Sequence, residues 1–187
     1  DNPFVDPVCG SGTIPIEAAL IGHNIAPGIN RDFQCERWIN LMPENLSDDV
    51  RDEADAKADY DIELDIHGYD IDQNMIDIAQ RNCQAAGLTH DITFKQLAVK
   101  DWHTDKINGV IDATPPYGER LSDQESVREL YRQMGEIYRP MTTWSKYILT
   151  ADLEFETYYG QKATKRRKLY NGALRTDLFQ YWGKKQR

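Results

Sequence analysis

The residues best suited to chemistry lie in the segment DATPPYGERL, which follows a short apolar run at Val110 and Ile111. Proline fixes φ and removes a backbone donor, so two consecutive prolines make a stiff loop whose carbonyl groups stay free to accept hydrogen bonds. Tyr117 adds a flat ring on which a flipped base could lie while its amino hydrogens are donated to loop acceptors. The alternative is a tight turn that positions a core tyrosine. The candidate catalytic residues are Thr114, Pro115, Pro116 and Tyr117.

A second candidate site is the glycine-rich turn DPVCGSG, which follows the apolar residues Phe4 and Val5. Glycine permits a tight turn and a close approach of ligand to backbone. The turn is not a P-loop, because no Gly-Lys-Ser/Thr follows. It is not the full dinucleotide fingerprint either, because Pro15 stands where the third glycine would be. The alternative is a helix-capping turn that binds no ligand.

Acidic residues follow the next two expected strands. Asp70 could accept hydrogen bonds from both hydroxyl groups of an adenosine ribose, and Asp101 could reach an adenine amine. Asp72 is better placed as a helix N-cap than as a ligand residue. The candidate cofactor-binding residues are Asp6, Pro7, Cys9, Gly10, Gly12, Asp70, Ile71 and Asp101.

A parallel sheet is needed to bring these candidates together. The sequence predicts strands at residues 4–6, 66–70, 91–97, 109–113 and 144–151, separated by helices, and this alternation indicates βαβ units with helices on both sheet faces. In such sheets ligands bind beyond the carboxyl ends of the strands, where the candidate residues lie. Two further segments, joined through Asn171-Gly172, predict a closing antiparallel hairpin.

The charge is unevenly distributed along the chain. The net charge is −9, yet the segment from Gln161 to the end holds nine Lys or Arg and one acid, so it is +8 and the preceding 160 residues are −17. Much of the acidic part lies in residues 43–65, which we interpret as a solvated helix within a surface insertion at about residues 23–65. The basic run is either a solvated edge or a phosphate-binding patch, and the candidate RNA-binding residues are Lys165, Arg166, Arg167 and Lys168.

Cysteine and histidine spacing points away from metals and disulfides. The three cysteines are far apart, with no CxxC, and the four histidines show no HxxxH spacing. We therefore expect no metal site and a reducing, cytoplasmic location. No apolar run approaches the ~20 residues needed to span a bilayer, so no membrane association is expected.

Five segments in this order resemble one known family. DPVCGSGTIPIEAA, NIAPGINR, GYDIDQNMI, TPPYGERL and RKLYNG extend over nearly the whole chain. Together they are similar to the catalytic domain of the bacterial THUMP-containing RNA methylases, in particular those that methylate guanine in large-subunit ribosomal RNA.

This resemblance implies a class I methyltransferase fold with a mostly parallel seven-stranded sheet over residues 1–187. It implies S-adenosylmethionine as methyl donor, the exocyclic amine of a guanine as acceptor and ribosomal RNA as partner. Asp6, Gly10 and Gly12 would line the methionine side of the cofactor, and Asp70 would hold the ribose. The chain starts at Asp1 without methionine. We expect a fragment that lacks the family's preceding helix and its RNA-binding THUMP region.

Two departures from the family pattern leave alternatives open. Thr114 stands where the family has asparagine, and its hydroxyl accepts from an amine only if its own proton has another partner. Asp112 replaces an apolar residue on the same strand face. The alternatives are methyl transfer to DNA or to a protein glutamine, or a catalytically impaired domain that binds cofactor or RNA.

Overall fold

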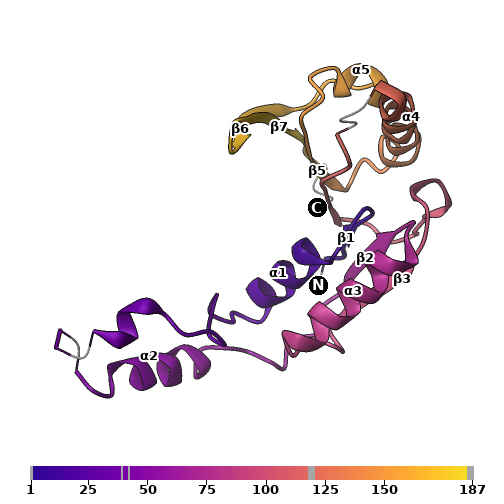
Figure 1. Ribbon diagram of the computed structural model, residues 1–187. Helices are drawn as coiled ribbons and strands as arrows, with labels where there is room; N and C mark the ends of the chain where they lie inside the picture. The colour runs from indigo at the N-terminus through magenta and orange to yellow at the C-terminus, as the bar shows by residue number, and fades with distance from the viewer. Residues whose placement is uncertain (1, 39, 42, 118–120, 185–187) are drawn as a thin grey trace.

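The computed structural model describes residues 2–38, 40–41, 43–117 and 121–184. Its strands form one seven-stranded sheet in the order β3-β2-β1-β4-β5-β7-β6 (Figure 1). The five strands from β3 to β5 are parallel, whereas β7 runs antiparallel to both β5 and β6. The expected parallel sheet with a closing antiparallel hairpin is thereby confirmed. The strands are β1 Phe4–Asp6, β2 Ile66–Asp70, β3 Ile92–Gln96, β4 Val110–Ala113, β5 Ser145–Thr150, β6 Lys165–Asn171 and β7 Leu174–Tyr181.

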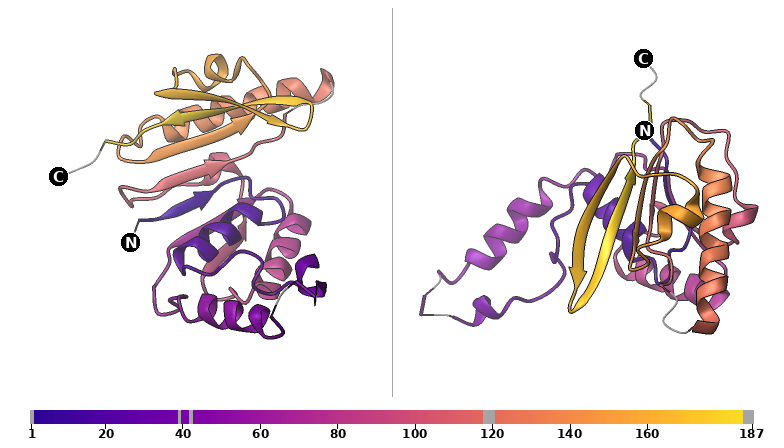
Figure 2. Two further views of the ribbon diagram at one scale, coloured as in Figure 1. Left: turned by 90° about the vertical axis from the view of Figure 1, so that its left-hand side faces the viewer. Right: turned by 90° about the horizontal axis from the view of Figure 1, so that it is seen from above.

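Helices cover both faces of the sheet, as Figure 2 shows. One face carries a core in which Ala19 of the first helix and Cys83 of the third meet Ile66 of β2. On the other face, Tyr131 and Met134 pack with apolar residues of β4, β5 and β7. The helices are α1 Thr13–Gly22, η1 Gln34–Arg37, α2 Leu46–Asp55, α3 Gln73–Ala85, η2 Val99–Asp101, α4 Leu121–Tyr138 and α5 Phe155–Tyr159.

The chain order creates a switch point between β1 and β4. The chain builds β1, β2 and β3 outward in one direction and then returns to place β4 on the other side of β1. Connections diverge on either side of such a point, which leaves a crevice at the carboxyl ends of the two strands. The loops that follow β1, β2 and β4 therefore lie around one crevice.

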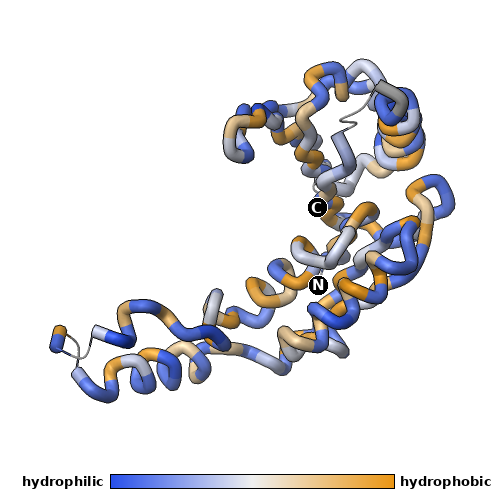
Figure 3. Tube along the Cα trace, viewed as in Figure 1, coloured by the Kyte–Doolittle hydropathy of each residue, from blue (hydrophilic) through white to orange (hydrophobic). Residues whose placement is uncertain are grey.

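The helix faces follow from the spacing of apolar residues. In α3, Ile76, Ala79 and Cys83 are buried, and Asp72 caps the helix by accepting a hydrogen bond from the Asn74 amide. In α4, the sequence indicates a stripe through Val127, Leu130, Met134 and Ile137. Figure 3 shows hydrophobic and hydrophilic bands alternating along this helix.

The buried face of α4 also includes two tyrosines that the stripe omits. Tyr131 and Tyr138 are both fully buried, and their aromatic bodies fill the space between α4 and the sheet. A tyrosine can be buried in this way when its ring packs in the core, even though its hydroxyl then needs a partner.

The hairpin turn is displaced by one residue from its expected position. Asn171 pairs with Leu174 and still belongs to β6, so the two turn residues are Gly172 and Ala173. Gly172 has φ +61°, which glycine adopts at little cost. The glycine of the Asn-Gly pair therefore opens the turn rather than closing it.

Residues 24–63, which we call the arm, extend away from the sheet (Figures 1 and 2). Helix α2 in this arm has no buried residue. The base of the arm is fixed by His23, which is 1% exposed. Its Nδ1 lies 2.8 Å from the Asp59 carbonyl oxygen and its Nε2 lies 2.9 Å from Asp91 Oδ1. His23 is thus a structural residue that ties the arm to the body.

Candidate active site

The glycine-rich loop after β1 is held tightly against its neighbours. Gly10 and Gly12 have φ values of +51° and +83°. The Gly12 amide donates to the Cys9 carbonyl over 2.9 Å. A Cβ atom at Gly12 would lie 2.9 Å from Cβ of Ala79 and 3.0 Å from the Phe94 ring. Glycine is therefore required at this position both for its backbone angle and for the close packing of α1 on α3 and β3.

Asp70 joins this loop to the end of β2. Its Oδ2 accepts a hydrogen bond from the Gly10 amide, and its Oδ1 accepts one from the Asp72 amide, each over 2.9 Å. Two backbone donors thus fix the carboxylate while each oxygen keeps a further lone pair. The carboxylate is oriented in advance for hydroxyl donors from a ligand.

A cavity of about 560 Å³ opens beside this carboxylate, and we call it the Asp70 cavity. Its wall combines the loop after β1, the end of β2, the segment after β3, the loop after β4 and one face of α4, and it is mainly apolar. This composition suits a largely apolar ligand held by a few polar groups. The lining residues are Pro7, Val8, Asp70, Ile71, Leu97, Ala98, Val99, Pro116, Ser126, Glu129, Leu130 and Gln133.

The structure thus brings some of the predicted cofactor residues together and leaves others apart. Pro7, Asp70 and Ile71 line the Asp70 cavity, whereas Cys9 is buried behind the glycine loop. Asp101 is exposed at the end of η2 and does not line this cavity. The reason is that the chain turns into η2 directly after β3, so residues 97–99 occupy the position that Asp101 was expected to take.

Sequence reasoning missed residues 97–99 and the α4 wall of the cavity. Residues 97–99 follow β3 directly, so the rule that directs attention to strand ends applies to them too. Because these residues are apolar, they were not among the polar side chains that the sequence singled out. The contribution of α4 depends on tertiary packing and carries no local signal.

Three carboxylates gather at the ends of β1, β2 and β4. Val5 pairs with Ile111, so Asp6 and Asp112 come next on adjacent strands. Burial, together with the charges of Asp112 and Asp70, raises the pKa of Asp6 to about 8. Burial raises the pKa of Asp112 to about 6. No described side chain donates a hydrogen bond to Asp112 or pairs with it, so only a hydrogen bond with the Ala113 backbone offsets the burial of its charged form.

The loop after β4 is supported from beneath by α4. The Tyr131 hydroxyl donates to the Pro116 carbonyl over 3.3 Å and lies 2.9 Å from the Thr150 hydroxyl of β5. The Pro116 carbonyl therefore already accepts one hydrogen bond, contrary to the expectation that the loop carbonyls are all free. Thr114 is half-buried at the start of the loop.

A smaller cavity, of about 220 Å³, lies on the far side of this loop, and we call it the Tyr117 cavity. It is formed by the loop after β4, the first turns of α4 and the segment after β5. Its lining residues are Tyr117, Gln124, Val127, Arg128, Ala151, Asp152 and Leu153.

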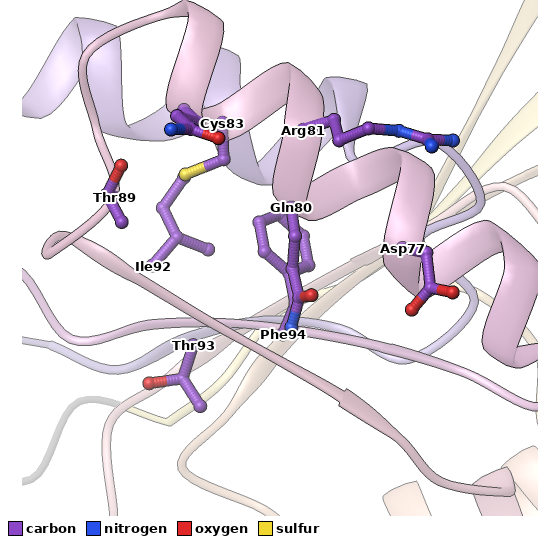
Figure 4. Close-up of a pocket in the computed structure, with 9 residues that line it drawn as sticks. Asp77, Gln80, Arg81, Cys83, Thr89, Ile92, Thr93 and Phe94 are labelled. Atoms are coloured by element: carbon purple, nitrogen blue, oxygen red, sulfur yellow. The ribbon is translucent and has the colours of Figure 1, made fainter.

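A hollow of about 670 Å³ lies elsewhere, between α3 and the edge strand β3 (Figure 4). The labelled residues include Arg81 and Asp77 of α3 and Thr93 of β3. None of the lining residues belongs to the loops after β1, β2 or β4. This hollow is therefore separate from the site that the sequence predicts.

The predicted basic residues are divided between the two faces of the hairpin. Because side chains alternate along a strand, Arg166 and Lys168 share one face and Lys165 and Arg167 the other. Arg166 is ion-paired with Asp177, and its guanidinium lies 4.7 Å from the Phe179 ring centre. In the described part of the chain, no carboxylate pairs with Lys165 or Arg167. The four side chains do not form one patch.

The described residues contain neither a metal site nor a membrane-spanning helix. No group of three or more His, Cys, Asp or Glu side chains there is arranged to hold a metal ion. No described helix combines the length and hydropathy that a bilayer span requires.

Comparison of sequences places the chain among methyltransferase domains. The model of the RMKL-like methyltransferase domain family matches residues 1–180. The chain is 53% identical over 184 residues to the Bacillus subtilis protein named "Putative RNA methyltransferase YpsC", covering 98% of this chain and 48% of that protein. It is 38% identical over 181 residues to the ribosomal RNA large subunit methyltransferase K/L of Shewanella amazonensis, covering 93% of this chain and 25% of that enzyme.

Two crystal structures are similar to the whole chain. That of SMU.472 complexed with SAH has a TM-score of 0.95 at 53% identity and covers 100% of this chain and 49% of its own. The second is that of a Listeria monocytogenes protein named as a predicted N6-adenine-specific DNA methylase. It has a TM-score of 0.92 at 58% identity and covers 98% of this chain and 47% of its own. The chain thus spans about half the length of these proteins.

Proposed function

Because the chain belongs to the RMKL-like methyltransferase domain family, we propose that it methylates the exocyclic N2 amine of a guanine in large-subunit ribosomal RNA. The observation that carries this proposal is the Asp70 cavity. Its wall holds both the carboxylate oriented by Gly10 and Asp72 and Pro116 of the loop that carries Thr114. One cavity therefore connects the carboxylate that would hold a ribose with the candidate catalytic loop.

The residues present fit S-adenosylmethionine, the cofactor of this fold family. Asp70 offers lone pairs to the two ribose hydroxyls, and the apolar residues Ile71, Leu97 and Pro116 would surround an adenine ring. Asp6, buried at the end of β1, would face the cationic amino acid portion. When bound, S-adenosylmethionine supplies a methyl group made electrophilic by the sulfonium sulfur.

The chain contributes mainly positioning to this reaction. The two prolines and the Tyr131 hydroxyl hold the loop rigid, so the Thr114 hydroxyl and the Pro115 carbonyl keep fixed positions as acceptors. Acceptors aimed at the attacking amine favour the positive charge that develops on its nitrogen. The Tyr117 ring supplies a stacking face that holds the base in line for attack.

Ribosomal RNA as the target is supported by the name of the K/L relative. DNA is the competing target because another relative is titled a DNA methylase. The basic hairpin residues Lys165 and Arg167 are available for phosphate contacts, and most of the RNA affinity is expected from a region outside this chain. We expect the reaction in the reducing cytoplasm, which suits the unpaired thiols.

The cofactor assignment is tested by titration calorimetry with Asp70→Ala. Loss of a charged acceptor for two hydroxyls should cost about 1.5–3 kcal/mol, or roughly 10- to 100-fold in affinity for S-adenosylmethionine. Asp77→Ala serves as a matched control, because Asp77 is exposed on α3 and is absent from the Asp70 cavity. Unchanged affinity in a folded Asp70→Ala variant would contradict the assignment.

The acceptor is tested by radiolabelled methyl transfer, followed by mass spectrometry of the nucleosides. Ribosomal RNA, genomic DNA and total protein from one cell extract are offered separately to the chain. The proposal expects label in RNA and N2-methylguanosine in the digest. Label confined to DNA or to glutamine would overturn it.

A further inference from the structure

The Tyr117 cavity contains a charged pair that the cofactor site does not use. Arg128 of α4 donates from Nη2 to Glu154 Oε2 over 2.8 Å, and its guanidinium lies 4.6 Å from the Tyr158 ring centre. Its Nε is buried and has no hydrogen-bond partner among the residues that the structure describes. The nearest carboxylate oxygen is Oδ2 of Asp152, 3.7 Å away. Arg128 is therefore fixed in place, while one of its buried donors is left without a partner in the described part of the chain.

Asp152 is oriented just as firmly. Its Oδ1 accepts a hydrogen bond from the Glu154 amide over 2.9 Å, and its own amide donates to the Thr150 hydroxyl over 3.1 Å. Its other oxygen, Oδ2, faces the Arg128 guanidinium without forming a hydrogen bond to it. The Asp152 side chain is 16% exposed. The cavity thus presents one carboxylate oxygen as an acceptor and one guanidinium edge as a donor.

These two groups lie beside the loop that would hold the reacting amine. β4 and β5 pair in parallel with Ala113 opposite Ile148, so the loop after β4 and the segment after β5 run side by side, and Tyr117 and Asp152 line the same cavity. Arg128 comes from α4 and lines the same cavity as the Tyr117 ring. The wall of this cavity therefore offers a carboxylate and a guanidinium 3.7 Å apart, next to the loop that begins with Thr114.

Guanine presents complementary groups along its Watson–Crick edge. Its N2 amine is followed by the N1–H donor and then by the O6 acceptor. Enzymes that act on a flipped base read this edge by hydrogen bonds. Adenine has an acceptor at N1 and a donor at N6, so it would leave Asp152 without a donor and place an amine against Arg128. Unpaired buried groups of this kind are the strongest basis for rejecting a competing base.

We infer that the Tyr117 cavity is the acceptor-base pocket and that Asp152 and Arg128 determine specificity for guanine. Asp152 accepts from N1–H, and Arg128 donates to O6. The inference rests on the proposed function and deepens it, since it names the residues that select the base. Glu154 has a different role, because it pairs with Arg128 but does not line the cavity.

The test uses short single-stranded RNA oligonucleotides that differ at one base, with the chain and labelled S-adenosylmethionine. The test base is guanine, adenine or 2-aminopurine, which keeps the 2-amine but lacks both O6 and the N1–H donor. The wild type should transfer methyl to guanine at least about 100-fold faster than to 2-aminopurine. In Asp152→Asn and Arg128→Met, the ratio of the guanine rate to the 2-aminopurine rate should fall below about ten. Each substitution should slow the reaction with guanine and leave the reaction with 2-aminopurine unchanged.

Glu154→Gln is the matched control, and it should keep the wild-type ratio within about two-fold. Calorimetry should give every variant the wild-type affinity for S-adenosylmethionine within about two-fold, which also shows that each is folded. If the wild type methylates 2-aminopurine as fast as guanine, or if both pocket variants keep the wild-type ratio, the inference is wrong.

Measurements of oligonucleotide binding distinguish a failure of this inference from a failure of the proposed function. If no oligonucleotide is methylated although S-adenosylmethionine binds, the proposed function fails. The pocket is then judged by competition, using the fluorescence of the 2-aminopurine oligonucleotide as probe. Guanine oligonucleotide should displace it at least about ten-fold better than adenine oligonucleotide from the wild type and equally well from Asp152→Asn. Equal displacement from the wild type would overturn the inference.

Discussion

At the scale of single residues, the carboxylates around the switch point differ in their surroundings. Asp70 is held by two backbone donors, whereas Asp6 is buried beside two other carboxylates. Burial near like charge disfavours the charged form of Asp6, although its Oδ1 accepts a hydrogen bond from the Val8 amide. Neighbouring residues of the same type are thus set up for different tasks.

The first prediction concerns Asp6 and pH. In the unfolded chain Asp6 ionises above its ordinary pKa of 3.8, whereas in the folded chain it stays protonated up to about 8. Between these values the folded state binds more protons than the unfolded state, so stability falls as pH rises, by up to about 1.4 kcal/mol per pH unit. Asp6→Asn cannot ionise, so it should gain stability relative to wild type from pH 5 to 8.

Urea denaturation at pH 5.5, 6.5, 7.5 and 8.5 measures this difference. Asp105→Asn, at an exposed position, provides the control. A difference between Asp6→Asn and wild type that stays constant with pH would mean that Asp6 is ionised in the folded protein.

A second residue-scale prediction concerns Thr114. Asparagine reaches further than threonine and offers a carbonyl oxygen as acceptor, so Thr114→Asn should raise the rate of methyl transfer by about 10- to 100-fold, or about 1.4–2.7 kcal/mol of transition-state stabilisation. The affinity for S-adenosylmethionine should stay the same, because Thr114 does not line the Asp70 cavity. Single-turnover transfer to ribosomal RNA measures the effect. Equal rates would show that the amine is held without a side-chain acceptor at position 114.

At the scale of elements, the loop after β4 depends on the packing of α4. Tyr131 links the Pro116 carbonyl to Thr150 of β5, and the same helix face packs on α5. Gly135 allows this close approach, since a Cβ atom there would lie 2.1 Å from the Tyr159 carbonyl oxygen. The position of α4 therefore sets both the core and the loop.

Gly135→Ala should accordingly destabilise the fold. Alanine is the better helix former by about 1 kcal/mol, but the overlap with backbone of α5 should outweigh this gain and give a net loss of about 1–3 kcal/mol. Glu136→Ala, at the neighbouring exposed position, should change stability by less than about 0.5 kcal/mol. Chemical denaturation compares the two. A Gly135→Ala variant as stable as wild type would show that α5 can shift freely.

At the scale of the whole molecule, the sheet body and the arm are distinct in charge and in packing. The arm holds eleven acidic and four basic residues. Within the arm, Arg51 donates to the carbonyls of Ile29 and Arg31 over 2.9 and 3.0 Å, which closes its outer part into a unit. The arm therefore contributes little to the core of the body.

Replacing residues 32–50 by five Gly and Ser residues should thus leave the fold intact. The ends of this segment are already brought together by Arg51, so a short linker can join them. We expect a shift in melting temperature below about 4 °C and an unchanged affinity for S-adenosylmethionine. Loss of cooperative unfolding, or affinity weakened more than about ten-fold, would show that the arm supports the sheet.

The sequence by itself determined the order of strands and helices and the strand-end candidates. These features depend on local patterns: apolar spacing in α3, Asp72 as a cap, and Asp70 at the end of a buried run. The fold and cofactor class inferred from the ordered motifs are confirmed by the sheet and by the matching family. The roles of individual site residues stay predictions.

Tertiary structure alone decided which of these residues meet. Asp6 lies beside Asp112 only because β4 returns to pair with β1, more than a hundred residues along the chain. Arg128 faces Asp152 only because α4 packs against the end of β5. Arg166 and Arg167 are neighbours in the sequence, but they lie on opposite faces of the hairpin because side chains alternate along a strand. Sequence spacing describes neighbours along one element, whereas the site is made of contacts between elements.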